Sequence, residues 1–485
     1  MIAPADFFLL APEIVLATAG LLLLLVGSIG RGLGNRESAG FAILGLLLTL
    51  GFAVWLQLEH LREPRIILAG TFILDRFAFF WKVLVLVATV FTVLLSVRFV
   101  EEGGYRPGEY YALLLLATSG MMFMAGGLSL LTIWISLELM ALASYILAGY
   151  FKTERKSIEA ALKYFILGAL SSGILLYGIS LLYGVAGTVQ LQELAAVLPG
   201  IWAQGNLLVP MGWIFLAAGL FFKVAAAPFH VWTPDVYTGA PTPVTAYLAA
   251  ASKAASFAIL LRILYQGLPG LAVDWQLIVA VVAVVSMVWG NLAALTQDNV
   301  KRLLAYSSIA HAGYVLVGVL ALNEMGLWAV VFYLLAYSFI TLGAFGTVIL
   351  LERREYAGQT CADYAGLARR SPFLAAMMLL FLIALTGIPP TGGFVGKFYL
   401  FAAALEAGWA WVAVVGVVMS AVSLYYYFRI AVFMYQMDAT ATTPVPLRSP
   451  ALVAAIAACA AITLLLGLYP GPFIELAKAS ALQVP

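Results

Sequence analysis

The stretch FFKVAAAPFHVWTPDVYTGAPTPVTA, from Phe221 to Ala246, contains the features that decide the fold. It begins as an apolar helix that carries a lysine, Lys223. Pro228 has no N–H to donate within that helix, so we expect the helix to break there, and Pro234 to end the regular structure. His230 lies two residues after the break. Freed backbone groups are tolerated in lipid only beside buried protein or a hydrated cavity, so this stretch predicts a membrane-embedded site.

The composition extends this prediction to the whole chain. Of its 485 residues, 64% are hydrophobic and only 10% are charged, whereas about 25% are charged in typical soluble domains. The mean hydropathy is +1.04. The 25 basic and 23 acidic residues leave a formal net charge of +2, which provides no basic face for nucleic acid. We therefore predict a membrane protein that does not bind nucleic acid.

The sequence offers little for a cofactor or a metal. Its two cysteines and three histidines cannot form a CxxC pair, an iron–sulfur run or a three-histidine zinc site. No G-x-G-x-x-G or G-x-x-x-x-G-K-[ST] string occurs. We expect no cofactor and no metal in this chain, so any redox chemistry takes place on another chain.

The long apolar runs predict an all-α polytopic fold, because a chain in hydrocarbon must satisfy its own backbone amides in helices of about 20 residues. The first run lacks the basic n-region of a secretory signal and is interpreted as a retained span. We count fourteen transmembrane helices, at residues 7–29, 39–58, 76–97, 108–126, 128–150, 157–184, 210–231, 243–265, 275–296, 300–321, 326–351, 372–406, 409–436 and 449–470.

The basic residues of the loops predict the orientation. Cytoplasmic loops carry an excess of lysine and arginine. The loops after even-numbered helices hold only Arg62 and Arg65. Loops after odd-numbered helices are therefore expected to be cytoplasmic and both termini to lie outside the cytoplasm. Those loops hold fourteen basic residues: Arg31, Arg36, Arg98, Arg106, Lys152, Arg155, Lys156, Lys301, Arg302, Arg353, Arg354, Arg369, Arg370 and Arg448.

Five charged residues fall well inside apolar runs: Glu138, Lys163, Lys223, Lys253 and Lys397. A lysine at the centre of a spanning helix costs about 2.5–3.5 kcal/mol, and four cost on the order of 10 kcal/mol. Static pairing with one carboxylate does not offset four lysines. A buried lysine can gain and lose a proton as nearby charges move, which arginine cannot do. We predict that these residues carry protons. Snorkelling to the interface is the interpretation for Lys82, Arg262 and Arg429, which lie nearer helix ends.

A second helix is also expected to break beside a lysine. In GIPPTGGFVGKFY, from Gly387 to Tyr399, two prolines and two glycines precede Lys397. One proline alone is as readily a packing kink as a functional feature. Two breaks beside buried lysines are typical of ion-transporting folds.

A shift of 174 positions brings Lys223 onto Lys397 and carries Glu138 to a position beside His311. It also takes Lys163 and Lys253 to tyrosines, Tyr337 and Tyr427. The shift therefore matches helices 4–8 with helices 9–13. Each unit has five helices, an odd number, so the second unit enters the membrane from the opposite side, which predicts two inverted repeats. His311 could link them as a proton relay or simply pack as a satisfied histidine. The expected organisation is helices 1–3 at residues 1–106, repeats at 107–265 and 274–437 that contain broken helices 7 and 12, and a last helix in 438–485.

Four strings closely resemble one protein family. They are the stretch quoted first, GIPPTGGFVGKFY, GNLAALTQDNVKRLLAYSSIAHAGY (Gly290 to Tyr314) and the Glu138 segment ISLELMALASYILAGYF. The family is that of the antiporter-like, proton-translocating membrane subunits of bacterial NADH–quinone oxidoreductase, respiratory complex I. Within it, PDVYTGAPTPVTA and the lysine at 397 are similar to the N-type subunits, and the resemblance covers nearly the whole chain.

This resemblance implies a translocase subunit of the bacterial cytoplasmic membrane, driven by quinone reduction in a neighbouring part of the complex. NADH, flavin, iron–sulfur clusters and quinone are expected on other subunits, and the partners are other membrane subunits, including antiporter-like ones. The alternative is a subunit of a multi-subunit sodium/proton antiporter; a structural scaffold is disfavoured by the insertion cost. By the same resemblance, Glu138 is the charged partner of Lys223, Lys163 a modulating charge, Lys253 a connecting site and Lys397 the terminal site, with His230 and His311 as relay candidates.

Overall fold

The computed structural model describes residues 4–28, 33–61, 63–352, 358–438 and 449–482. Within them, eleven helices are long and apolar enough to cross a membrane. They include eleven of the fourteen predicted spans. The other three correspond to a 20-residue helix at Pro107–Gly126 that is less apolar, and to the two segments expected to break, whose halves are shorter. Arg31, Arg62, Arg353, Arg354 and Arg448 lie outside the described residues.

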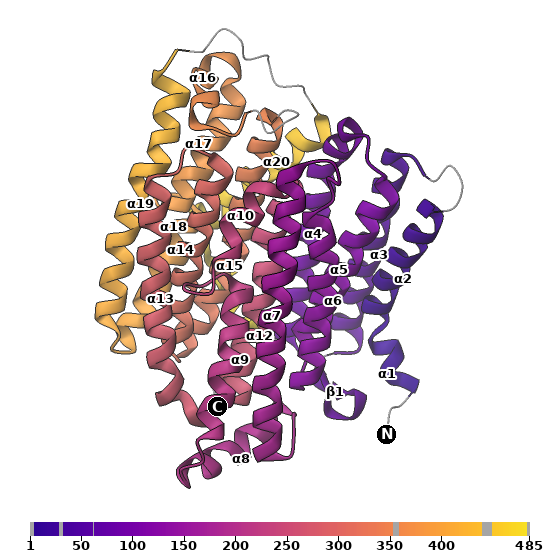
Figure 1. The fold of residues 1–485 in the computed structure, drawn as a ribbon, viewed down its shortest axis with the longest axis vertical. Coiled ribbons are helices and arrows are strands. Elements are labelled where there is room, and N and C mark those ends of the chain that lie inside the picture. Colours follow the sequence, from indigo (N-terminus) through magenta and orange to yellow (C-terminus); the bar gives the residue numbers. More distant parts are fainter. Residues whose placement is uncertain (1–3, 29–32, 62, 353–357, 439–448, 483–485) are drawn as a thin grey trace.

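The N-terminal part contains four helices and a small hairpin (Figure 1). The hairpin pairs two antiparallel strands with Ile66 opposite Ile73, which is the one departure from the predicted all-α fold in the described part of the chain. The side chain of Asp75 accepts a hydrogen bond from Ala78 N at 2.7 Å and so caps the helix after the hairpin. The elements are α1 (Pro4–Leu9), α2 (Ala11–Ser28), α3 (Asn35–Glu59), β1 (Arg65–Ile67), β2 (Phe72–Leu74) and α4 (Arg76–Gly103).

The middle of the chain contains the first broken segment. Its helix stops at Val224 and resumes at Trp232, so the break around Pro228 is present. The sequence predicted that Pro234 ends the regular structure, and this prediction is wrong. Pro234 lies in the first turn of a new helix, where no backbone N–H is needed. The elements are α5 (Pro107–Gly126), α6 (Leu130–Ala148), α7 (Arg155–Ala186), α8 (Leu191–Ala203), α9 (Leu208–Val224) and α10 (Trp232–Gly239).

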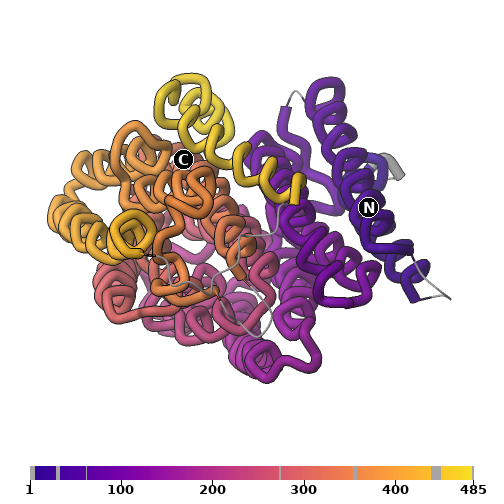
Figure 2. The backbone as a smooth tube through the Cα atoms, turned by 90° about the horizontal axis from the view of Figure 1, so that it is seen from above, coloured from indigo at the N-terminus to yellow at the C-terminus, as the bar shows by residue number. Residues whose placement is uncertain are grey.

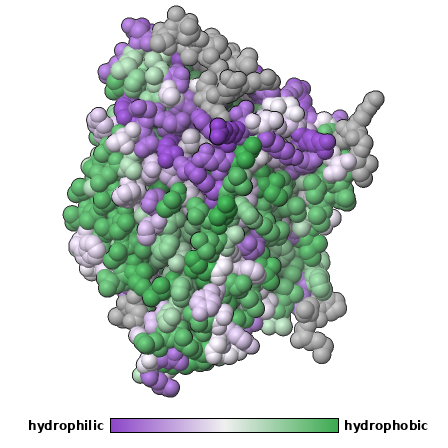
Figure 3. Space-filling model, viewed as in Figure 1, coloured by the Kyte–Doolittle hydropathy of each residue, from purple (hydrophilic) through white to green (hydrophobic). Residues whose placement is uncertain are grey.

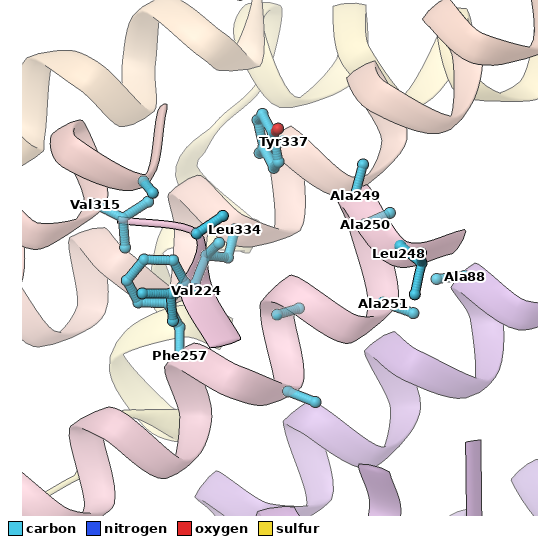
Figure 4. Packing of buried hydrophobic residues seen from close by; sticks show 14 of the residues in the cluster. Ala88, Val224, Leu248, Ala249, Ala250, Ala251, Phe257, Val315, Leu334 and Tyr337 are labelled. Carbon is cyan, nitrogen blue, oxygen red and sulfur yellow. The ribbon is translucent and has the colours of Figure 1, made fainter. Parts of the chain in front are cut away.

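The next helix, at Thr242–Gly267, has the most buried spanning window of the fold. We call it helix eight, because it is the eighth predicted span; it is not α8 (Leu191–Ala203). Its spanning window is 100% buried within the protein. It consists of α11 (Thr242–Tyr247), a π-helical turn (Leu248–Ser252), α12 (Lys253–Arg262) and a second π-helical turn (Ile263–Gly267). Small side chains permit this burial, and Figure 4 shows Leu248 and Ala251 beside Ala88 of α4.

The second half of the chain contains the other broken segment, between Thr386 and Gly392. Asparagines cap two of its long helices: Asn299 accepts from Arg302 N at 3.0 Å and Asn323 from Gly326 N at 2.7 Å. The elements are α13 (Ala272–Leu295), α14 (Val300–Leu320), α15 (Glu324–Leu351), α16 (Leu367–Arg370), α17 (Pro372–Thr386), α18 (Gly392–Glu406), α19 (Ala410–Gln436), α20 (Pro450–Leu468) and α21 (Gly471–Ser480).

Seen from above, the N-terminal helices form one side of the molecule and the second half forms the other (Figure 2). Helix α20 packs against both α4 and α15, so the end of the chain ties the two sides together. Hydrophobic residues cover the middle of the face drawn in Figure 3, and hydrophilic residues gather at its upper end. Exposed apolar side chains on α2, α3, α6 and α7 are consistent with contact with lipid or a membrane partner.

Candidate functional site

Lys223 lies in the last turn of α9, immediately before the first break. Its side chain is buried, and its Nζ lies 3.4 Å from the hydroxyl of Tyr145 on α6. Gly168 on α7 leaves room for that hydroxyl, because a Cβ there would stand 2.1 Å from it. The sequence therefore placed the buried lysine correctly but missed its tyrosine partner.

Glu138 lies two turns before Tyr145 on α6 and is half-buried, beside exposed apolar residues of the same helix. Its carboxylate accepts a hydrogen bond from Ser172 Oγ of α7, which also accepts from Trp134 Nε1 at 3.0 Å. No ion pair within 4 Å joins Glu138 to Lys223 among the described residues. The two charges therefore interact across a longer distance than direct pairing, with Tyr145 contacting the lysine.

Lys163 differs from the expectation of an unpaired, central lysine. It lies near the start of α7 with 41% of its side chain exposed, and its Nζ pairs with Glu159 at 2.6 Å and with Asp235 at 2.7 Å. Asp235, in α10, also binds Arg302 Nη1 at 2.7 Å. The prediction that Glu138 is the one carboxylate available to the four lysines is wrong, because Asp235, on another helix, pairs with Lys163.

Lys253 is the first residue of α12, where the first π-helical turn of helix eight ends. It is buried, and its Nζ donates to the carbonyl oxygen of Ser308 on α14 at 2.6 Å and to the Ser308 hydroxyl. The same Nζ lies 5.7 Å from the ring centre of Tyr337 on α15. Lys253 therefore joins helix eight to two helices of the second half.

His311 lies one turn after Ser308 on α14 and is buried. Its Nδ1 contacts the hydroxyl of Tyr333, and its Nε2 lies 3.2 Å from the hydroxyl of Tyr427, which also contacts Ser307 Oγ. Both ring nitrogens thus have hydroxyl partners. Such a histidine is satisfied in its packing and is also connected on both sides, as a relay requires.

Lys397 lies five residues into α18, after the second break. Its Nζ donates to the carbonyls of Leu385 and Thr386, freed at the end of α17, and to Ser420 Oγ, each at 2.9 Å. It also stands 4.4 Å from the ring centre of Tyr314 on α14. The break therefore supplies the oxygens that hold this lysine in an apolar environment.

One face of α14 connects these sites. Ser308, His311 and Tyr314 follow at three-residue spacing and so share a face; the first contacts Lys253 and the last lies beside Lys397. We call Lys223, Lys253, His311 and Lys397 the central row. Apolar packing surrounds it: Figure 4 shows Val224, Phe257, Val315 and Leu334 packed together. The polar spacing in SSIAHAGY was the signal that could have revealed this face.

His230 is not brought to the central row by any interaction of the described residues. It is half-buried in the break, its Nδ1 has no hydrogen-bond partner in the part of the chain that the structure describes, and its ring lies 6.2 Å from that of Trp289 on α13.

The constant shift of 174 positions does not align the two breaks, because Lys223 precedes its break and Lys397 follows its own. If the break between α9 and α10 is aligned with the break between α17 and α18, Lys397 corresponds to a position in α10 and not to Lys223.

Snorkelling was the wrong interpretation for two basic residues. Lys82 is buried and pairs with the buried Glu13 at 2.5 Å, and Arg262 is fully buried against Asp75. Arg429 keeps 22% of its side chain exposed and binds the carbonyl of Leu295. Lys301, assigned to a loop from the sequence, is buried in α14 and donates to the carbonyl of Ala240 at 2.9 Å.

The chain is similar to known membrane proteins over nearly its whole length. Residues 127–423 match the family model described as NADH:quinone oxidoreductase/Mrp antiporter, TM. NADH-quinone oxidoreductase subunit N 2 of Rhizobium meliloti is 44% identical over 470 residues, covering 97% of this chain and 96% of that protein. A chain of respiratory complex I from Thermus thermophilus with bound aureothin superposes with a TM-score of 0.81 at 35% identity, covering 96% of this chain and 99% of that one. A chain of the Mrp complex from Dietzia sp. superposes with a TM-score of 0.83 at 25% identity, covering 99% and 96%.

Proposed function

Because this chain belongs to the subunit N family of NADH-quinone oxidoreductase, within the antiporter-like membrane subunits, we propose that it moves protons along the central row, from Lys223 through Lys253 and His311 to Lys397. One observation carries this proposal: three lysines and a histidine are buried, and hydroxyl or carbonyl oxygens rather than carboxylates hold them. Buried amines without a static counter-ion can change protonation state when a neighbouring charge moves.

Glu138 and Lys163 are proposed to supply that moving charge. At 4 Å, opposite charges attract by about 4 kcal/mol at an effective dielectric of about 20, and the attraction weakens with distance. When Glu138 moves closer, Lys223 holds its proton; when Glu138 moves away, desolvation favours release toward Lys253. Lys163 modulates this step through Asp235 and Arg302, which tie it to α10 and α14. His230 is proposed as a side relay at the first break.

The driving reaction and the partners are proposed to lie on other chains. Quinone reduction elsewhere in the complex drives the charge movement, and the nicotinamide, flavin, iron–sulfur and quinone sites belong to other subunits. The half-buried Glu138, among exposed leucines and isoleucines of α6, supports a membrane subunit as the neighbour on this face. Antiporter-like subunits are the proposed neighbours.

Fourteen crossings, two inverted five-helix repeats and termini outside the cytoplasm form the proposed membrane arrangement. Each lysine of a broken segment belongs to the half-helix that lies lower in Figure 1, α9 or α18. The two halves of the chain thus present a buried lysine and a break in corresponding helices, which supports the repeats even though the constant shift does not hold.

A sodium/proton antiporter remains the second candidate, because the Mrp chain has a closely similar fold. Purification of the chain with its natural partners separates the two. We expect co-purification of NADH-oxidising subunits, and NADH-driven proton translocation into vesicles in sodium-free buffer. Co-purification with antiporter subunits alone, or translocation that requires sodium, would contradict the proposal.

A further inference from the structure

A second pair of buried charges lies in the N-terminal helices, outside the central row. Glu13 in the first turn of α2 and Lys82 in α4 pair at 2.5 Å, with side-chain exposures of 0% and 5%. The central row does not use either residue. Burying an ion pair among apolar helices gives little net stability, because desolvation offsets the attraction. The pair therefore calls for a role beyond holding the helices together.

A cavity of about 20 Å³ adjoins this pair. It lies between the ends of α2, α3 and α4 nearest β1 and has a partly polar lining: Gln57, Asp75 and Lys82, with Leu9, Pro12 and Leu61. Its volume suffices for one water molecule. In the described part of the chain, Gln57 Oε1 on the cavity wall is buried without a hydrogen-bond partner, so a water there meets an unsatisfied group. Glu13 lies behind Lys82: its Oε1 pairs with Lys82 Nζ, and its Oε2 is buried without a hydrogen-bond partner.

The cavity is linked to helix eight. Asp75 lines it and binds Arg262 through both guanidinium Nη atoms at 3.0 Å. Arg262 also donates to the carbonyl of Ala125 at 3.0 Å and ends α12, the helix that Lys253 begins. The charge state of the cavity therefore acts on the helix that carries a member of the central row.

The charges favour a proton over a metal cation as the occupant. Of the charged groups, Lys82 and Asp75 line the cavity, and Asp75 is already bound to Arg262, so no unpaired carboxylate on the wall is left to ligate a metal cation. A proton needs only one acceptor, and the carboxylate of Glu13 lies next to Lys82. The other charged and titratable groups on the elements around this end are Asp6, whose carboxylate accepts from Leu68 N, and the surface residues Glu59, His60, Glu63, Arg65 and Arg76.

We propose that the cavity is a second proton-exchange site, through which Lys82 and Glu13 take up and release a proton on the side of the membrane where α1 lies; the role in pumping rests on the proposed function. Lys82 passes one N–H proton to a carboxylate oxygen of Glu13, and a hydronium ion in the cavity replaces it on Nζ. One O–H bond forms on Glu13 and one N–H bond of Lys82 breaks; then one O–H bond of the hydronium ion breaks, the N–H bond of Lys82 re-forms, and water is left. The pair gains one positive charge.

The first test measures water access in the assembled complex. Gln57→Cys should react with a small membrane-impermeant thiol reagent added on the α1 side. Leu48→Cys, on the same apolar helix at a position that is 57% exposed and that we expect to face lipid, should not. The natural cysteines are both buried, and burial raises the pKa of the Cys361 thiol. Equal labelling rates at positions 57 and 48 would overturn the proposal. Labelling does not require the complex to turn over. A negative labelling result therefore argues against the cavity site alone, and loss of proton translocation along the central row is measured separately.

The second test separates proton exchange from a structural pair. Glu13→Gln leaves Lys82 buried without its counter-ion, whereas Glu13→Gln combined with Lys82→Met removes both charges at similar volume. We expect the double variant to assemble at the wild-type level and still lose proton translocation per NADH oxidised. A double variant that recovers both assembly and translocation would show that the pair is only a structural contact.

Discussion

At the scale of single residues, Lys223 is the most exacting test of the central row, because its Nζ has one hydroxyl partner and a buried environment. We expect Lys223→Ala to lower proton translocation on the order of 10²-fold, as loss of a positioned proton-transfer group does. Lys223→Arg should fail as well, since arginine does not release its proton. Translocation by vesicles with equal amounts of assembled complex measures both. A fully active arginine variant would contradict proton release from this side chain.

Substitutions of Glu138 test whether the charge or the shape of this side chain matters on the exposed face of α6. Glu138→Gln keeps the hydrogen bond from Ser172 and removes the charge, whereas Glu138→Asp keeps the charge on a shorter side chain. Since no direct ion pair with Lys223 is present, the interaction is weaker than the value of about 4 kcal/mol at 4 Å. We expect the glutamine variant to pump much less than the aspartate variant in the same vesicle assay. Equal pumping by Glu138→Gln and wild type would leave this carboxylate as a structural contact.

At the scale of elements, the second break positions Lys397. Gly387 has a φ of +87°, and a Cβ there would stand 2.8 Å from Lys397 Cδ. Gly408, after the other end of α18, has a φ of +83° and nothing within 4 Å of its Cβ position. Alanine at either position costs roughly 1–2 kcal/mol in backbone conformation.

We therefore expect Gly387→Ala and Gly408→Ala to lower thermal stability similarly, but only Gly387→Ala to lower proton translocation. Thermal unfolding and vesicle assays on matched preparations measure the two effects. If both variants pump equally well, the position of Lys397 does not depend on the shape of the break.

The elements also show what the sequence could and could not predict. Lysines in apolar runs identified Lys223, Lys253 and Lys397, because insertion into lipid makes a central charge costly wherever it falls. The contact of Lys163 with Asp235 joins positions 72 residues apart on different helices, and no local pattern reveals it. Pro234 was misinterpreted for a related reason: a proline can end one helix or begin the next, and only the path of the chain decides.

At the scale of the whole molecule, the basic residues predict the orientation in the membrane. The structure supports termini on one side: α1 lies at the lower end in Figure 1, and Lys478 of α21 lies 5.8 Å from the ring centre of Trp328, at the start of α15. A reporter fused after Pro485 should therefore be active only if it works outside the cytoplasm. Activity of a reporter that needs the cytoplasm would mean that the number of crossings is odd or the orientation reversed.

Helix eight, enclosed on all sides in the finished fold, has a consequence for how the protein is made. Exposed to lipid alone, Lys253 at the centre of helix eight would cost roughly 2.5–3.5 kcal/mol, and Arg262 would add a further cost. Asp75, the partner of Arg262, has left the ribosome before helix eight, whereas Ser308, the partner of Lys253, follows it. We therefore expect helix eight to leave the translocon only after α14 has been made, with the charge of Arg262 already satisfied by Asp75 and that of Lys253 satisfied last.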